Sequence, residues 1–197
     1  MKTVLLIDGG YLRASALESG RQYAAPLVET FARQCVGADE YLLRVLYYDA
    51  PPYDGRVQKP VSGNWKTFKP TDTLLSDLEK LERFAVRRGK LGFRGWKPRT
   101  IPIAGTAGLT DADFKPLFEQ KGVDMRVGLD IAAFANRQSV ARIVLVSGDT
   151  DMIPAMKEAR RAGLEIVLAK LPPPARSPHD NLIAHSDLVR NVAWPAP

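Results

Sequence analysis

The sequence has few of the residues on which several common kinds of site depend. It contains one cysteine and two histidines in 197 residues. The single cysteine, Cys35, excludes an intrachain disulfide and a multi-cysteine zinc site, and its apolar neighbours indicate a place in the core. The two histidines, His179 and His185, both lie near the C-terminus. They give little support to a histidine-based zinc site or a Ser-His-Asp triad.

Long hydrophobic runs are also lacking. No stretch of about 18 apolar residues occurs, so no membrane span is expected. The N-terminal apolar stretch is about five residues long and runs directly into Asp8, which is too short for a secretory signal peptide. The expected location is therefore the cytoplasm.

The composition is that of an ordinary globular protein, with 45% hydrophobic and 25% charged residues. This length is most simply one domain, residues 1–197, with enough residues to bury a substantial core. The net charge of +6 permits nucleic-acid binding but does not establish it.

Apolar periodicity predicts alternating strands and helices. Short buried strands are expected at residues 3–7, 41–48, 143–147 and 165–169, with a last edge strand at 188–192. Helices are expected at residues 26–35, 71–89, 111–120, 124–138 and 151–162. This alternation is typical of a layered α/β fold with a mainly parallel central sheet.

Three segments stand outside this alternation. Residues 50–70 hold four prolines and two glycines among basic and aromatic residues, which predicts a long loop, either a lid over the site or a floppy insertion. Residues 90–104 look extended and basic. A C-terminal extension begins at about residue 171 with a run of three prolines, interpreted as a surface connector.

Two of the predicted strands end in carboxylates. The first runs into Asp8-Gly9-Gly10, and the strand at 143–147 runs into Gly148-Asp149-Thr150-Asp151. Because parallel strands place their carboxyl ends at one edge of the sheet, three carboxylates should meet there. Such groups repel each other, and a hard divalent cation is the usual remedy. Capping is the alternative interpretation: Asp8 would cap the segment that follows it, and Asp149 the helix that begins near Asp151.

A third element is Lys121-Gly122-Val123-Asp124 at the start of the helix at 124–138. Asp124 is interpreted as a metal ligand, with simple capping as the alternative. Asp130 falls on or beside the buried stripe of that helix, where a carboxylate needs a cation or a hydrogen bond. Lys121 is either a phosphate contact or a surface lysine.

In combination, these phrases resemble the NYN domain family within the PIN-like nuclease group. The matching pieces are Leu6 to Gly10, Lys121 to Asp124 with Asp130, Val146 to Met152, the helix end at Ala159 to Gly163 and the closing Asp187 to Val189. The resemblance implies a Rossmann-like, three-layer PIN-type fold and a carboxylate cluster that holds Mg²⁺ or Mn²⁺. It also implies metal-dependent hydrolysis of phosphodiester bonds, typically in RNA. The implied ligands are Asp8, Asp124, Asp149 and Asp151, with Asp130 secondary. One carboxylate, Asp149 or Asp151, would accept the proton of the attacking water.

The sequence departs from the family pattern at two places. Many members carry asparagine where Tyr11 stands, and the basic loop at 50–70 is not part of the shared pattern. The first departure puts activity in question, and the second could set the choice of substrate or partner.

Substrate binding would require a cationic track beside the carboxylates. Basic residues alternate with aromatic ones along 65–99, as in proteins that stack unpaired bases, although each such residue could equally solvate the surface or pack in the core. The expected substrate contacts are Lys121, Ser147, Thr150, Tyr11, Arg94, Lys97, Lys66 and Trp65. The family resemblance favours single-stranded RNA over DNA as the partner.

Other functions fit these residues less well. A non-catalytic nucleic-acid or protein-binding module on the same fold is the main alternative. A phosphatase of the haloacid dehalogenase type would need a second aspartate where Gly10 stands, and the first turn lacks the glycine spacing of a dinucleotide site. The oligomeric state stays open, a homodimer included.

Overall fold

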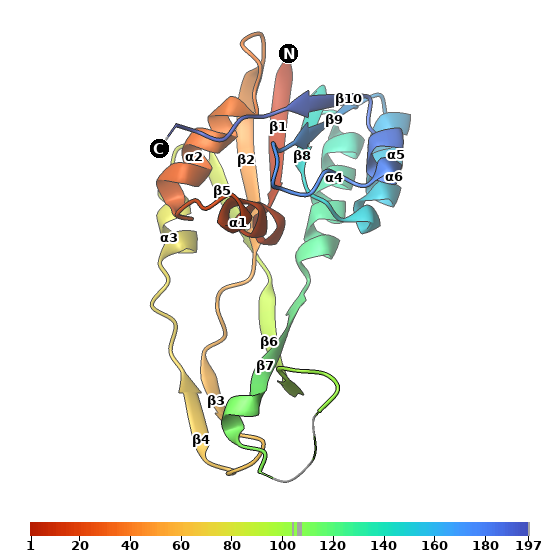
Figure 1. Ribbon diagram of the computed structural model, residues 1–197. Coiled ribbons are helices and arrows are strands. Elements are labelled where there is room, and N and C mark those ends of the chain that lie inside the picture. The colour runs from red at the N-terminus through yellow and green to blue at the C-terminus, as the bar shows by residue number, and fades with distance from the viewer. Residues whose placement is uncertain (104, 106–107, 197) are drawn as a thin grey trace.

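A computed structural model describes residues 1–103, 105 and 108–196, which form a layered body and a projecting arm (Figure 1). The body contains a six-stranded sheet in the order β10-β9-β8-β1-β2-β5, and every neighbouring pair is parallel. The strands are β1 (Lys2–Asp8), β2 (Tyr41–Asp49), β5 (Phe84–Arg88), β8 (Arg142–Val146), β9 (Glu165–Lys170) and β10 (Leu188–Asn191). The predicted α/β fold with a parallel central sheet is confirmed.

Helices cover both faces of this sheet. One face carries α1 (Gly9–Glu18), α2 (Ala25–Gln34) and α3 (Leu74–Leu78), and the other carries α4 (Val123–Arg137), α5 (Ile153–Arg161) and α6 (Asp180–Ala184). Alternate side chains of β1 serve the two layers, because Leu5 and Ile7 pack on the α1 side while Val4 and Leu6 pack on the α4 side. Each fully buried leucine or isoleucine contributes about 1.5–3 kcal/mol.

A buried ion cluster fastens the amino-terminal edge of the sheet. The side chain of Glu40 is fully buried and pairs with Arg142 of β8 and Arg190 of β10. Burial alone would raise the pKa of Glu40. Hydrogen bonds from Arg190, from the backbone N–H of Gly37 and from Arg142 outweigh it and hold the pKa at about 2. This end of the sheet is therefore held by structural charges.

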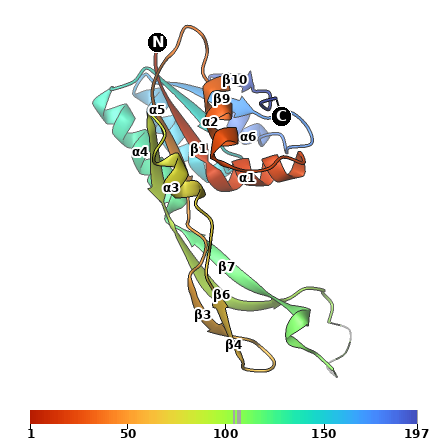
Figure 2. The ribbon, with the colours of Figure 1, turned by 90° about the vertical axis from the view of Figure 1, so that its left-hand side faces the viewer.

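The arm extends from the carboxyl ends of β2 and β5 (Figures 1 and 2). It consists of two antiparallel ribbons, β3 (Gly55–Gln58) with β4 (Trp65–Phe68), and β6 (Lys90–Pro98) with β7 (Phe114–Lys121). A short 3-10 turn, η1 (Asp111–Asp113), precedes β7.

The predicted loop at 50–70 was wrong in its centre, where the chain forms the β3–β4 hairpin. Its prolines flank the paired strands, where no ladder hydrogen bond is lost. The arm thus carries ordered strands where a lid or a floppy insertion was expected.

Two predicted helices were also wrong. Residues 111–120 form η1 and strand β7, because half-buried Phe114, Pro116 and Phe118 alternate with exposed residues in the period of a strand. The helix predicted at 71–89 stops at Leu78, and the chain turns through Arg83 (φ 65°) into β5. Pairing of β5 with β2 overrides the local helix propensity there.

Two helices were not expected from the sequence. These are α1, which starts directly after Asp8, and α6 in the C-terminal extension. The predicted edge strand of that extension is confirmed as β10, parallel to β9. Among the described residues, no helix has the length and apolar character needed to span a bilayer.

Candidate functional site

The turn after β1 places Asp8 at the carboxyl edge of the sheet. Its Oδ1 atom accepts a hydrogen bond from the backbone N–H of Tyr11 (3.1 Å), so Asp8 is the N-cap of α1. Gly9 leaves room for the Tyr47 side chain, because a Cβ at Gly9 would lie 2.5 Å from the Tyr47 hydroxyl oxygen. Capping fixes the orientation of Asp8 and leaves its second oxygen, Oδ2, available for a contact with the neighbouring strand end.

The turn after β8 meets the first turn, because β1 and β8 are neighbours. Buried Ser147 donates from Oγ to Asp8 Oδ2 (3.3 Å) and accepts the backbone N–H of Asp149 (3.1 Å). Asp149 Oδ1 in turn accepts the N–H of Asp151 (2.9 Å) and caps the 3-10 turn η2 (Thr150–Met152). The two strand ends are therefore joined through Ser147, which the sequence had suggested only as a substrate contact.

Asp124 approaches the same edge from the first turn of α4. It lines a small pocket together with Asp8 and Ser147, over the apolar side chains of Val127 and Met152. Burial, and then the charges of Asp149 and Asp151, raise the pKa of Asp124. Four predicted carboxylates are thus close enough to act on one another.

The pKa of Asp8 is also raised. Burial is the main cause, and the charge of Asp124 adds to it, while hydrogen bonds from Tyr11 and Ser147 act in the opposite direction. No lysine or arginine is among the main causes of the shifted pKa of Asp8 or Asp124 in the described part of the chain. Negative charge is therefore concentrated at this edge.

The donor set suits a hard divalent cation, although the carboxylates do not form a closed cage. Among residues 1–103, 105 and 108–196, no three His, Cys, Asp or Glu side chains are gathered tightly enough to hold a metal ion. Mg²⁺ commonly takes only one or two carboxylates and keeps several waters, so a closed cage is not needed. The residues present fit such a partly hydrated ion.

Asp130 is not part of this cluster but contacts a residue that lines its pocket. Its Oδ2 accepts hydrogen bonds from the Tyr48 hydroxyl (2.9 Å) and from Arg87 Nε (2.9 Å). Tyr48 lines the pocket beside Asp8, so Asp130 supports the wall of the site from behind. Its partners are side chains, whereas the sequence left open a metal or a backbone hydrogen bond.

The predicted substrate contacts divide into two groups. Ser147, Thr150 and Tyr11 lie at the carboxylate turns, and Lys121 ends β7 three residues before Asp124, with its Nζ 3.8 Å from Glu119. The other four predicted contacts belong to the arm strands, away from the carboxylates (Figure 2): Lys66, Trp65, Arg94 and Lys97.

One group at this edge was missed. Asp49 ends β2, is buried, and pairs with Arg13 of α1 while accepting the N–H of Ala50. The Tyr47 hydroxyl also reaches Asp49 (3.4 Å), and it shares a 2.7 Å hydrogen bond with Tyr23. A strand that ends in aspartate was the available signal. Because Asp49 faces the α1 side and is paired with Arg13, it fastens α1 and lies outside the cluster of Asp8, Asp124, Asp149 and Asp151.

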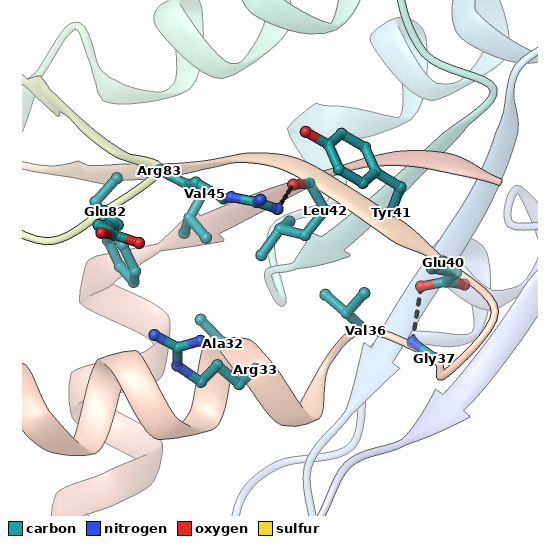
Figure 3. A pocket seen from close by; sticks show the side chains of 11 residues that line it. Ala32, Arg33, Val36, Gly37, Glu40, Tyr41, Leu42, Val45, Glu82 and Arg83 are labelled. Atoms are coloured by element: carbon teal, nitrogen blue, oxygen red, sulfur yellow. Dashed lines mark hydrogen bonds between the residues drawn. The ribbon is translucent and has the colours of Figure 1, made fainter.

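A second cavity lies at the opposite end of the sheet (Figure 3). Its volume is about 470 Å³, and it lies between α2 and the starts of β2 and β5. Its polar groups are satisfied locally, since Arg83 donates to the carbonyl of Leu42 and Glu40 accepts the N–H of Gly37. No predicted site residue lines it.

Comparison with known proteins identifies the family. A model of the NYN domain matches residues 75–189, which is more than half of the chain. The chain belongs to the NYN domain family. NYN domains are PIN-like, and membership supports a nuclease-type function. Asp124, Asp149 and Asp151 fall inside the matched range, whereas Asp8 and Tyr11 precede it.

A solved structure shares the NYN chain's fold. The crystal structure of a protein of unknown function from Vibrio parahaemolyticus superimposes with a TM-score of 0.55 over 98% of this chain and 93% of that chain, at 16% identity. At this identity the likeness concerns the fold alone. No curated protein matches the sequence.

Tyr11 gives the NYN site a feature that can be tested. A Cβ at Gly148 would lie 2.8 Å from the Tyr11 ring, and the Tyr11 hydroxyl is held by the carbonyl of Arg176 (3.1 Å). We expect Gly148→Ala to lower the free energy of unfolding by about 1–3 kcal/mol through overpacking. Urea denaturation measures this loss.

Two further variants test the cause of that loss. With Tyr11→Asn in the background, Gly148→Ala should cost much less, because the ring is gone. Gly128→Ala is the control, since its Cβ would meet nothing closer than 4.0 Å. Equal costs of Gly148→Ala in both backgrounds would contradict the clash with Tyr11.

Proposed function

We propose that this protein is a divalent-metal-dependent nuclease that hydrolyses phosphodiester bonds of single-stranded RNA. One observation carries the proposal. Asp8, Asp124, Asp149 and Asp151 lie at the carboxyl edge of the sheet, and burial together with the charges of neighbouring aspartates raises the pKa values of Asp8 and Asp124. Ligands in open parallel sheets bind at this edge.

The four carboxylates would hold Mg²⁺ or Mn²⁺. When bound, such an ion stabilises charge on a phosphoryl oxygen and lowers the pKa of a bound water. Asp149 or Asp151, whichever is less engaged, would take the proton of the attacking water. Both are well placed for proton transfer to solvent, since Asp151 is exposed and Asp149 is half-buried.

The remaining residues of the site orient these carboxylates. Ser147 fixes Asp8 and the backbone of Asp149 at once, so the two strand ends keep one relative position. Asp130 is proposed as a positioning residue, because it holds Tyr48 against the pocket and Arg87 beside it. Thr150 lies between the two aspartates of the turn, where its hydroxyl would meet the substrate.

RNA is proposed over DNA because of the family resemblance, and the test compares the two directly. Labelled single-stranded RNA and DNA of the same base sequence are incubated with the protein in Mn²⁺, Mg²⁺ or EDTA. We expect cleavage of RNA in the presence of metal and none in EDTA. Faster cleavage of DNA would reassign the substrate, and cleavage unaffected by EDTA would contradict the metal site.

A non-catalytic nucleic-acid-binding module is the second candidate. The specific observation in its favour is Tyr11, which stands at a position where many family members carry an asparagine. The ring of Tyr11 packs on Gly148. Under this candidate, RNA is bound but not cleaved in any metal. The same assay, read for both binding and cleavage, separates the two functions.

A further inference from the structure

The arm holds all of the protein's net charge. Its two segments, residues 51–70 and 89–121, contain ten lysines and arginines against four aspartates and glutamates, a net charge of +6. The whole chain also has a net charge of +6, so the rest contains 18 basic and 18 acidic residues and is neutral. A polyanion would therefore be attracted to the arm in preference to the body.

In the β6–β7 ribbon, two lysines of β6 each lie directly opposite a lysine of β7. Lys90 is the cross-strand partner of Lys121, and Lys97 is the partner of Lys115. All four side chains are exposed. Like charges at directly opposite positions destabilise a strand pair, so this ribbon is not optimised for its own stability. Anions bound between the lysines would remove that cost.

The lysine pairs share the outward face of the ribbon. In β7, exposed Lys115, Leu117, Glu119 and Lys121 alternate with the half-buried Phe114, Pro116 and Phe118. Arg94 joins the outward face through its ion pair with Glu119. That face carries five cations and one carboxylate along its length.

Aromatic side chains pack between the two ribbons of the arm and support the strands that carry this face. On the inward side, Tyr53, Phe68, Phe93 and Phe118 form one cluster with ring centroids 5.4–6.2 Å apart, which joins the two ribbons. Trp96 extends it and donates from Nε1 to the carbonyl of Gln58 (2.7 Å). Of the aromatic residues expected to stack on bases, Phe68, Phe93 and Trp96 are occupied in this way.

Trp65 differs from the other aromatic residues. It lies on the opposite face of β4 from Phe68, is 57% exposed, and has the guanidinium of Arg56 5.2 Å from its ring centroid. Although Arg56 lies against the ring, the exposed part of the ring is open to an unpaired base. A surface for single-stranded nucleic acid combines cations that follow the phosphate backbone with aromatic rings on which bases stack. The lysines of the ribbon and the exposed ring of Trp65 supply these two components.

The ribbon leads directly to the carboxylates. β7 ends at Lys121, and Asp124 follows in the first turn of α4. An eight-residue strand spans about 27 Å. A strand of nucleic acid lying along the outward face would therefore reach the carboxylate edge with one end.

We propose that the outward face of the β6–β7 ribbon is a phosphate-binding track for single-stranded nucleic acid, on which the Lys90–Lys121 and Lys97–Lys115 pairs hold the backbone. Delivery of the bound strand to the carboxylates rests on the proposed nuclease function. Binding along the ribbon does not, and the two are measured separately.

The test measures binding without cleavage. Fluorescence anisotropy is recorded with labelled single-stranded RNA of about 16 nucleotides, near the upper site size of single-strand binders, in EDTA and with Asp149→Asn in the background. Affinity is measured over a series of salt concentrations. Removing one lysine that binds a phosphate should reduce the slope of log K against log salt by about 0.7.

Lys97→Glu separates binding from stability. It converts a like-charge pair with Lys115 into an opposite-charge pair, so the thermal midpoint should stay the same or rise while RNA affinity and salt slope fall. Substitution of a residue with only a structural role would not lower RNA affinity while keeping or raising the thermal midpoint. Lys97→Ala with Lys115→Ala is the second variant, and its slope should fall by about 1.4.

Lys157→Glu is the matched control. It makes the same change in net charge at an exposed position of α5 on the body, and the salt slope should stay at the wild-type value. Equal loss of affinity in Lys157→Glu and Lys97→Glu would overturn the track. Unchanged RNA binding in Lys97→Glu together with a change in oligomeric mass by light scattering would assign the ribbon to self-association instead. Binding without cleavage by the wild-type protein would overturn the nuclease proposal and leave the track intact.

Discussion

Replacing Asp149 with asparagine should lower the rate of metal-dependent RNA cleavage at least about a hundredfold while the fold stays intact. A metal ion at a phosphoryl centre contributes several kcal/mol, and each 1.4 kcal/mol is a factor of about ten in rate. Asparagine keeps the carbonyl oxygen that accepts the N–H of Asp151 and is as good an N-cap as aspartate. The loss would therefore follow from the missing charge, and circular dichroism should show an unchanged fold.

Asp72→Asn is a matched control for that variant. Asp72 Oδ1 accepts the N–H of Leu74 (2.8 Å), two residues on, in the same pattern as Asp149 and Asp151, but it lies before α3, outside the carboxylate cluster. Its cleavage rate should equal that of the wild-type protein. Equal rates for Asp149→Asn and Asp72→Asn would show that the carboxylate of Asp149 takes no part in the reaction.

Divalent metal should stabilise the protein at neutral pH. Because the pKa values of Asp8 and Asp124 are raised in the folded state, folding favours their protonated forms. Stability is therefore lost as pH rises from the ordinary carboxyl range through the raised values, and both groups are a cost at neutral pH. A cation at about 100 times its Kd should add about 2.7 kcal/mol, or a shift in thermal midpoint of about 5–10 °C.

The pH dependence of this gain identifies its source. At acidic pH, below the raised pKa values of Asp8 and Asp124, both carboxyls are protonated, and the shift produced by Mn²⁺ in a thermal unfolding scan should largely disappear. Asp124→Asn should unfold at a higher temperature than the wild-type protein in EDTA at neutral pH and should gain less from Mn²⁺. A shift that is the same at both pH values, or unchanged in Asp124→Asn, would place the metal elsewhere.

The body of the fold followed from short-range patterns in the sequence. Buried strands of a parallel sheet appear in the sequence as apolar runs, and β1 and β8 were found by that signal together with the turn residues that follow. Their adjacency, now seen in the pairing of β1 with β8, followed from parallel topology. The proximity of the carboxylates at this edge could thus be predicted from the sequence.

The arm could not be predicted in the same way. The strands of its β6–β7 ribbon are held by pairings between segments distant in sequence, such as Phe93 with Phe118, and local propensity carries no information on those partners. The same limitation gave a helix at 111–120, where alternating burial appears only once β6 lies alongside. It also extended α3 over β5, since Ala85 fits either periodicity until β5 pairs with β2.

The sequence predicted where the carboxylates lie but not which residues they contact. Sequence spacing placed Asp130 on the correct face of α4, yet its partners, Tyr48 and Arg87, come from β2 and β5 and are invisible to spacing. Asp49 was passed over for a related reason. A strand-ending aspartate looks the same in sequence whether it faces the open cluster or, as here, an arginine of α1.

The location of bound Mn²⁺ tests the central claim most directly. Crystals grown with Mn²⁺ and measured near its absorption edge give an anomalous signal at each bound ion. The account predicts a peak within coordination distance of Asp124 and at least one of Asp8, Asp149 and Asp151, absent from crystals of Asp149→Asn with Asp124→Asn. The metal-dependent site would be contradicted by wild-type crystals that show no anomalous peak beside these carboxylates, provided that the carboxyl end of the sheet is open to solvent in the crystal.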